Sequence, residues 1–301
     1  MTVTAIPTAA APVANPSPKR RPRPLSRGRD WVRVGLWIAL LFSVLIWAVP
    51  LIFMVFTSLK SEADIFGTPA FVPPWNPEWG NYVEALDRGN LLTAGGNSLI
   101  VAIIKVPVGL FISAAAAFAL SRMRFKRQRL LMGVIALGAM VPIQVAIAPL
   151  FQVINGLNLL STNLGLILPY IAFGLPYQTF ILYGFFRQIP EEIDESARID
   201  GAGNWRLFLT IILPLAKPAL AALFILDFVA TWNEYSIALA LLQSQDSWTI
   251  PLALQGFQSQ FTSSYGPLNA FTIMSVFPVL IVYLMFQRYF VEGAFAGAVK
   301  G

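Results

Sequence analysis

The sequence predicts an all-α, polytopic membrane protein with six transmembrane helices and one polar cytoplasmic loop. Three observations predict this fold: the composition, the number of long apolar runs, and the distribution of basic residues between those runs. Of the 301 residues, 56% are hydrophobic and 12% are charged, whereas soluble domains average about 25% charged residues. A soluble core of this size could not bury so much apolar surface, so the lipid bilayer is the expected solvent.

Six apolar runs have lengths near the roughly 20 residues that a membrane helix needs. They lie at about residues 34–58, 97–120, 130–153, 163–186, 218–242 and 269–290. A signal peptide is the competing interpretation of the first run, but at about 25 residues this run is far longer than the apolar region of such a peptide. We therefore expect an uncleaved span. Residues 1–30 are rich in Ala, Pro and Arg, which predicts a disordered basic tail before a membrane domain over residues 31–301.

The basic residues indicate how the spans are oriented. They gather in the N-terminal tail and in the connections after the second and fourth runs, whereas the opposite connections hold only Lys60 and Arg88. Basic loops stay in the cytoplasm, so both termini are expected there. The net charge of +6 then belongs to loops that face anionic membrane lipid, and no nucleic-acid partner is expected because no basic–aromatic stripe occurs.

The connection between the fourth and fifth runs, residues 189–220, is unusually polar. Pro190 and the acidic residues after it suit the start of a helix, where the dipole favours negative charge. Arg198 lies within one helical turn of Asp194 and Glu195, so we expect it to pair with them. These features predict a short surface helix.

The residues that follow predict a turn and a second helix. Gly201 permits the left-handed conformation that ends a helix, and Asn204 is suited to cap the next helix, which leads into the fifth span. Such an element suits docking to a cytoplasmic partner. A lipid-bound amphipathic helix is the competing interpretation, but such helices are usually rich in Lys and Arg, and this one begins with acids.

The same segment carries a family resemblance. Glu195 is followed by two small residues, by a glycine six positions later, and by Ile-x-Leu-Pro. This pattern resembles the cytoplasmic loop of ABC-importer permeases, with serine in place of the usual first alanine. The matching residues are Glu195, Ser196, Ala197, Asp200, Gly201, Ile211, Leu213 and Pro214. Together with FTSLKS, GNSLIVA, ALSRMRF, TWNEY and YFVEGAFAGAVKG, they make residues 31–301 similar to the carbohydrate, maltose-type branch.

The resemblance implies a function and a set of partners. The chain would be the permease subunit of an importer in a prokaryotic inner membrane, moving a sugar or sugar-like solute (oligosaccharide, polyol or sugar phosphate) into the cytoplasm. Its loop would couple to two ATP-binding subunits. A second permease subunit, a distinct homologue, and an extracytoplasmic solute-binding protein would complete the complex. No GxxxxGK[ST] motif occurs, so ATP and magnesium are expected on the partner ATPase and no cofactor in this chain.

Three charged residues fall within the apolar runs, where burial is costly. Lys105 lies about two turns from the outer end of its span, and we expect it to extend to the membrane surface. For Asp227, a lining of the translocation path and a hydrogen bond to a neighbouring helix remain equal alternatives. Glu234, with Trp232 and Asn233, suits either sugar contact or helix packing. Asp227, Trp232, Asn233 and Glu234 are therefore the candidate path residues.

Enzymatic function is not expected. The sequence contains no cysteine and no histidine, so it lacks thiol nucleophiles and the commonest general base and metal ligand. No metal site is expected. The alternative function is a secondary transporter or channel for small polar solutes, which would show internal repeats and a discontinuous helix. No repeat is visible, and that class does not require the loop from Glu195 to Pro214.

Overall fold

The computed structural model describes residues 28–257 and 264–298, and within these ranges it is helical with no strand. The all-α prediction is confirmed. Four helices are long and apolar enough to cross a membrane, and two bent helix pairs bring the count to six if each pair is one span. The continuous ones are α1 (Gly28–Ser58), α4 (Leu91–Arg122), α7 (Asn163–Phe186) and α14 (Tyr265–Ala298). The predicted tail lies, as far as residue 27, outside the described residues.

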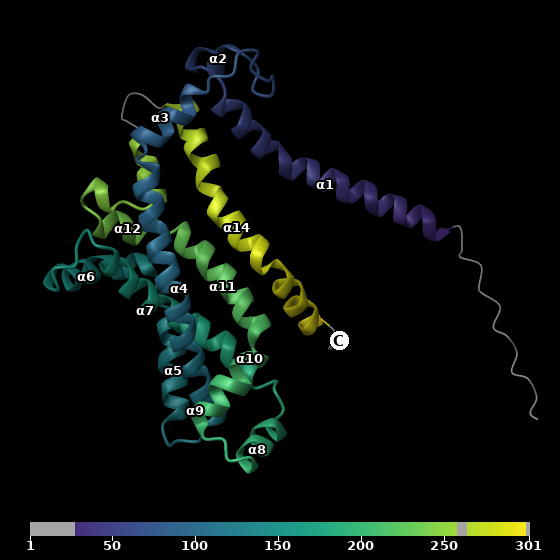
Figure 1. Cartoon of the computed structure of the whole chain (residues 1–301), viewed down its shortest axis with the longest axis vertical. Coiled ribbons are helices and arrows are strands. Elements are labelled where there is room, and N and C mark those ends of the chain that lie inside the picture. The colour runs from purple at the N-terminus through teal and green to yellow at the C-terminus, as the bar shows by residue number, and fades with distance from the viewer. Residues whose placement is uncertain (1–27, 258–263, 299–301) are drawn as a thin grey trace, which may run out of the picture. The chain divides into compact units, whose positions relative to one another are not determined.

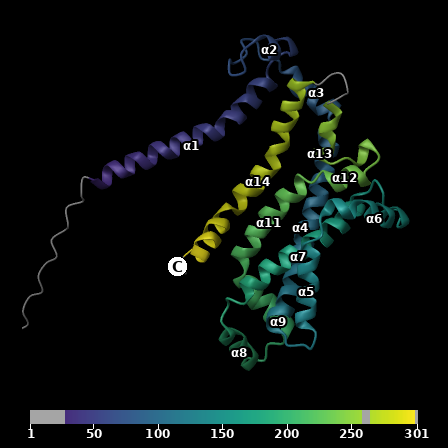
Figure 2. The ribbon, with the colours of Figure 1, turned by 180° about the vertical axis from the view of Figure 1, so that it is seen from behind.

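The chain divides into two compact units, residues 1–50 and 51–301. The described part of the first unit is the first 23 positions of α1, from Gly28 to Pro50. From Val34 onward this helix is apolar on all sides, as expected for a helix in lipid. The second unit contains the other helices and every functional candidate. Its short helices are α2 (Glu62–Gly67), α3 (Gly80–Arg88), α8 (Glu191–Ile199), α12 (Ser236–Leu241) and α13 (Ile250–Ala253). Figures 1 and 2 show α8 at the opposite end of this unit from α2 and α3.

The third predicted span is not a continuous helix. Residues 130–153 fall into α5 (Gln128–Ala139) and α6 (Ile143–Gly156), which meet at an angle of 98°. Pro142 lies between them in an extended conformation. Proline has no amide hydrogen and disfavours a helical conformation in the residue before it. The apolar run predicted the length of this span but not its bend.

The fifth predicted span is also divided. Residues 218–242 were expected as one helix, but α11 (Lys217–Trp232) ends early and the short α12 follows. At its other end, α11 is preceded by α9 (Asn204–Leu207), a π-helical turn (Phe208–Ile212) and α10 (Leu213–Leu215), and the bend between α10 and α11 is 75°. Pro214 and Pro218 flank this bend and account for the break.

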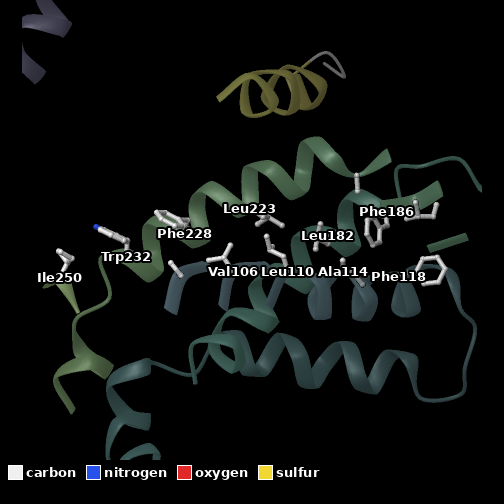
Figure 3. Packing of buried hydrophobic residues seen from close by; sticks show 14 of the residues in the cluster. Val106, Leu110, Ala114, Phe118, Leu182, Phe186, Leu223, Phe228, Trp232 and Ile250 are labelled. Atoms are coloured by element: carbon white, nitrogen blue, oxygen red, sulfur yellow. The ribbon is translucent and has the colours of Figure 1, made fainter. Parts of the chain in front are cut away.

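The core of the second unit lies where α4 packs against α7 and α11. Figure 3 shows Val106, Leu110 and Phe118 of α4 meeting Leu182, Phe186, Leu223 and Phe228 of the other two helices. Ala114 is fully buried between them. Small residues let membrane helices approach closely, and van der Waals packing then holds them. This packing brings the ends of α4 and α7 together beside α8 and encloses the charged residues between α4 and α11.

Candidate functional site

The predicted surface helix is present as α8. It follows Pro190, carries Glu191, Glu192 and Asp194 in its first turn, and is followed by Gly201 with φ +79°. This positive φ is the left-handed conformation that glycine adopts without steric cost. The helix prediction and the left-handed turn at Gly201 are confirmed.

The predicted polar contacts of this segment are wrong in two respects. Asn204 begins α9 without capping it, and its side-chain oxygen accepts a hydrogen bond from Arg198 Nη2 at 3.2 Å. Arg198 therefore bridges the two helices of the loop, instead of pairing with Glu195 or Asp194 on its own helix. Asp194 has a different partner, because it faces into the protein and is buried.

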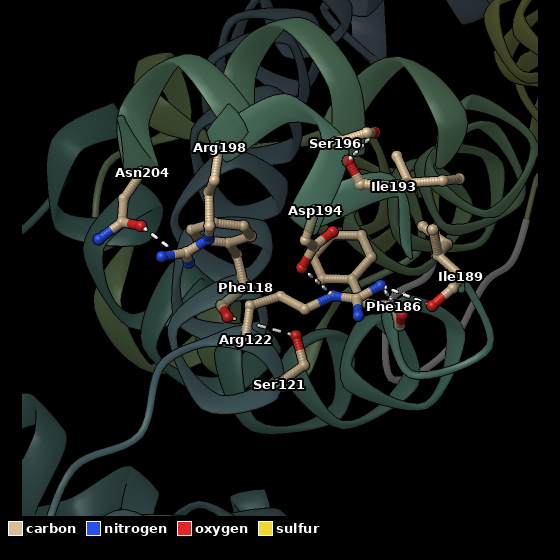
Figure 4. Close-up of polar contacts among 10 residues, drawn as sticks. All are labelled: Phe118, Ser121, Arg122, Phe186, Ile189, Ile193, Asp194, Ser196, Arg198 and Asn204. Atoms are coloured by element: carbon tan, nitrogen blue, oxygen red, sulfur yellow. Dashed lines mark hydrogen bonds and ion pairs between the residues drawn. The ribbon is translucent and has the colours of Figure 1, made fainter. Parts of the chain in front are cut away.

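That partner is Arg122, the last residue of α4. Its guanidinium Nη2 donates to the backbone oxygens of Phe186 at 2.9 Å and Ile189 at 2.8 Å, and its Nε lies 3.4 Å from Asp194 Oδ2 (Figure 4). The Arg122 side chain is only 4% exposed. One buried guanidinium thus joins the end of α4, the end of α7 and the middle of α8. Sequence reasoning counted Arg122 only as an orientation signal, since nothing local in the sequence pairs it with Asp194.

Two opposing effects act on the pKa of the Asp194 carboxyl group. Burial raises the pKa of its carboxyl group above the usual value, while the nearby Arg122 and Arg198 oppose this rise by favouring the charged form. A cavity of about 720 Å³ lies beside this group. It is bounded by charged residues of α8 and of the ends of α4 and α7, among them Arg122, Arg124, Arg187, Glu191, Asp194, Glu195 and Arg198.

The eight predicted loop residues occupy different environments. Glu195, Ser196, Asp200, Gly201 and Pro214 are exposed, Ala197 is buried, and Ile211 and Leu213 are half-buried against the core. Large apolar side chains that sequence reasoning did not select are also exposed here, above all Ile199 at 86% and Trp205 at 66%. The loop therefore presents an acidic surface with apolar side chains and is fixed from behind by Ala197 and Asp194.

Inside the membrane domain, the expectation for Lys105 is wrong. Its side chain is buried and forms an ion pair with Asp227 of α11. A carboxylate on the neighbouring helix compensates the charge directly, so the amine does not need to reach the surface. Gly174 of α7 lies beside this pair: a Cβ there would be 3.4 Å from Lys105 Nζ, an ordinary van der Waals contact, and 3.1 Å from Gln178 Nε2.

The four candidate path residues separate into two pairs, Trp232 with Asn233 and Asp227 with Glu234. Trp232 is buried, stacks on Phe228 with ring centroids 5.8 Å apart, and donates from Nε1 to the Ser275 oxygen at 3.2 Å. Asn233 donates to a backbone oxygen of its own helix. Neither lines the cavity described next. In contrast, Asp227 and Glu234 do.

This second, open cavity, of about 430 Å³, is lined by residues of α4, α6, α7 and α11 and by the start of α12. Glu234 Oε2 accepts a hydrogen bond from the hydroxyl of Tyr170 at 2.5 Å, and its Oε1 accepts one from the Ile237 amide at 2.8 Å. The lining residues are Lys105, Ile143, Tyr170, Phe173, Gly174, Tyr177, Leu226, Asp227, Ala230, Thr231, Glu234 and Ile237. Tyr170 and Lys105 are the functional candidates here that sequence reasoning missed.

Known proteins resemble this chain in sequence and in fold. Residues 105–293 match the family model described as binding-protein-dependent transport system inner membrane component. The diacetylchitobiose uptake system permease protein of Streptomyces coelicolor is 36% identical over 266 residues, covering 87% of both chains. The trehalose/maltose transport system permease protein of Thermococcus litoralis is 34% identical over 273 residues, covering 89% of this chain and 97% of that protein.

Solved structures agree on the fold. A crystal structure of a bacterial ABC transporter involved in the import of the acidic polysaccharide alginate contains a chain with a TM-score of 0.73 and 24% sequence identity. The match covers 88% of this chain and 98% of that one. Family model and relatives agree on a membrane permease of a transport system, and the solved structure agrees on the fold. The chain therefore belongs to the family of binding-protein-dependent transport system inner membrane components, as a multi-pass permease subunit of an ABC importer.

Proposed function

We propose that this permease carries a sugar or sugar-like solute into the cytoplasm and receives its driving force through α8 and the turn that follows it. The observation that carries the proposal is the attachment of α8. Its outer surface is exposed, while Arg122 ties its inner face to the ends of two membrane helices. A force applied to α8 would reach α4 and α7 through that guanidinium and reach α11 through the π-helical turn and α10.

The docking surface would consist of the predicted loop residues, from Glu195 to Pro214. Exposed Ile199 and Trp205 supply the apolar anchors that protein interfaces usually contain, and the acidic residues around them supply charge complementarity. Ala197 and Leu213 lie beneath this surface and transmit its position to the core. The carbohydrate class of solute is supported by the relatives, whose names specify diacetylchitobiose and trehalose or maltose.

The complete importer would contain further proteins. Two ATP-binding subunits would hold ATP and magnesium, a distinct homologous permease would complete the pathway, and an extracytoplasmic protein would deliver the solute. With α8 on the cytoplasmic side, both termini would also lie in the cytoplasm, in agreement with the basic residues.

The absence of cysteine from the sequence makes a direct test possible. Ser196→Cys places one thiol on the exposed side of α8, and Glu84→Cys places one on exposed α3 at the other end of the unit. In intact cells, a membrane-impermeant maleimide should label Glu84→Cys and not Ser196→Cys. In membranes with the co-expressed ATPase, a bifunctional thiol reagent should cross-link Ser196→Cys to that subunit. Labelling of Ser196→Cys from outside, or the absence of any cross-link while ATP-driven uptake continues, would refute the docking role.

A further inference from the structure

The connection between α1 and α3, residues 59–79, presents a group of large aromatic side chains that the proposed function does not use. Phe66, Phe71, Trp75 and Trp79 are all exposed, and Trp75 is 93% exposed. Single exposed apolar residues are common on proteins, whereas several together in one short segment indicate contact with lipid or with another protein. The position of the segment beside the membrane helices distinguishes between these two partners.

The contact of Phe71 with α1 gives the depth of this connection. The rings of Phe71 and Phe53 pack edge to face, with their centroids 6.2 Å apart. Phe53 lies five residues before Ser58, where α1 ends, which is a rise of about 7.5 Å along the helix. Helical side chains also lean toward the N-terminus of their helix, away from that end. Because the rise exceeds the separation of the rings, Phe71 lies beside the apolar helix and not beyond its end.

A second membrane helix places the connection at the same interface. The ring of Phe66 in α2 packs edge to face against Tyr265, with the centroids 5.8 Å apart. Tyr265 is the first residue of α14, and α2 and α3 both pack against this helix (Figure 1). The aromatic segment therefore follows the end of one membrane helix and contacts the start of another. Tryptophan and tyrosine are enriched at this level of membrane proteins, where the headgroups meet the acyl chains.

The only basic residue of the connection faces inward. Lys60 is buried, and its ammonium group donates to the backbone oxygen of Pro69 at 2.9 Å. Asn81 of α3 donates to the backbone oxygens of Ser58 and Lys60, at 3.0 and 2.9 Å, and so fixes the start of the connection. The acidic residues of the same segment are Glu62, Asp64 and Glu78. One positive and three negative charges give a net formal charge of −2, so attraction to anionic lipid does not hold the segment at the membrane.

We propose that the α1–α3 connection is an interfacial anchor, in which Phe71 and Trp75 insert at the boundary between lipid headgroups and acyl chains. The anchor holds the end of α1 and the start of α14 at a fixed depth, by apolar contact and independently of lipid charge. A soluble protein that approaches from the water is a poorer partner, because it does not reach a ring that lies beside a membrane helix. The inference requires a membrane-spanning chain and does not depend on the docking of α8 or on the solute.

Spin labels can measure the depth of the connection, because the sequence contains no cysteine. Asn76→Cys carries a nitroxide label next to Trp75, and Gln245→Cys carries a reference label on the exposed 3₁₀ turn Gln245–Ser247. The importer is assembled in phosphatidylcholine nanodiscs. Electron paramagnetic resonance then measures collisions of each label with oxygen, which concentrates in lipid, and with a nickel chelate, which stays in water. The label at Asn76 should collide more with oxygen, and the label at Gln245 more with the chelate.

A second measurement tests Trp75 itself. Trp75→Ser removes the ring, and because this side chain is exposed, its loss removes little packing within the chain. Amide hydrogen exchange of α2 in nanodiscs should nevertheless accelerate about tenfold, since a tenfold change needs lipid contact over only about 55 Å² of apolar surface. An aromatic side chain can bury about 150–250 Å². Trp75→Phe keeps an aromatic ring and should leave exchange nearly unchanged, and adding phosphatidylglycerol should not increase the protection.

Four results would overturn the proposal. A label at Asn76 that collides with the nickel chelate as much as the label at Gln245 would place the connection in water. Exclusion of both reagents from the Asn76 label would show that another protein covers the connection. Unchanged exchange in Trp75→Ser, or an effect that appears only with anionic lipid, would contradict anchoring by an aromatic ring. None of these results alters the proposed function, which ATP-driven uptake tests separately.

Discussion

Replacing Arg122 by methionine should release α8 from the membrane helices. Methionine keeps much of the apolar stem but removes the guanidinium, and with it the hydrogen bonds to the Phe186 and Ile189 oxygens, at 2.9 and 2.8 Å, and the contact with Asp194 at 3.4 Å. Hydrogen bonds that involve a charged group contribute about 1.5–3 kcal/mol each. The longer ion pair adds little here, because Asp194 has a raised pKa and can take up a proton when its partner is lost.

Phe186 ends α7, so only the hydrogen bond to Ile189, two residues before α8, holds the start of this helix. At the lower limit of about 1.5 kcal/mol, its loss is roughly a tenfold change in the equilibrium between attached and detached α8. Backbone amide hydrogen exchange in α8 should accelerate by about that factor. In the reconstituted importer, fewer solute molecules should be imported for each ATP hydrolysed, since the ATPase would move a helix that no longer moves α4 and α7.

Arg187→Met is the matched control. Arg187 lines the same cavity with the same charge, but it is exposed and its guanidinium lies over the ring of Tyr183, 5.8 Å from the centroid. Its loss should change exchange and coupling little, because exposed charges contribute little to stability. The reasoning about Arg122 would be refuted if Arg122→Met left both quantities unchanged, or if Arg187→Met altered them equally.

Three further outcomes follow from the same geometry. Gly201→Val, at φ +79°, should strain the turn by about 2 kcal/mol and reduce uptake per ATP, whereas Gly203→Val, at φ −72° with open space around it, should not; equal effects would contradict this. Because burial raises the pKa of Asp194, ionisation of this carboxyl group opposes docking of α8. Amide hydrogen exchange of α8 in Arg122→Met, corrected for intrinsic exchange, should therefore slow as the pH falls. The double variant Arg122→Met with Asp194→Asn should lose this pH dependence. Glu195→Lys should weaken co-purification of the ATPase without affecting membrane insertion, and unchanged recovery of the ATPase would argue against an acidic docking surface.

The sequence predicted elements whose signals are local. The α8 helix, its glycine turn and the apolar runs were recognisable because each signal lies within the segment that it predicts. These signals are acidic residues that suit the helix dipole, Gly201, and the length of each apolar run. The contacts of Arg122 with Asp194 and of Lys105 with Asp227 were not predictable, because each joins residues that only helix packing brings together. The average hydrophobicity of an apolar run also predicted a continuous helix where the structure has a bent one, because a single proline bends a span without changing that average.

The corner between α5 and α6 limits what can surround this chain. A backbone that turns within the hydrocarbon layer has peptide groups that acyl chains cannot solvate, so only polypeptide or water can lie against it. Met140 and Val141, at this corner, are 76% and 50% exposed in the single chain. Where this corner lies within the hydrocarbon layer, lipid acyl chains cannot lie against it, and an assembled transporter has to cover it with a neighbouring subunit or with its hydrated interior.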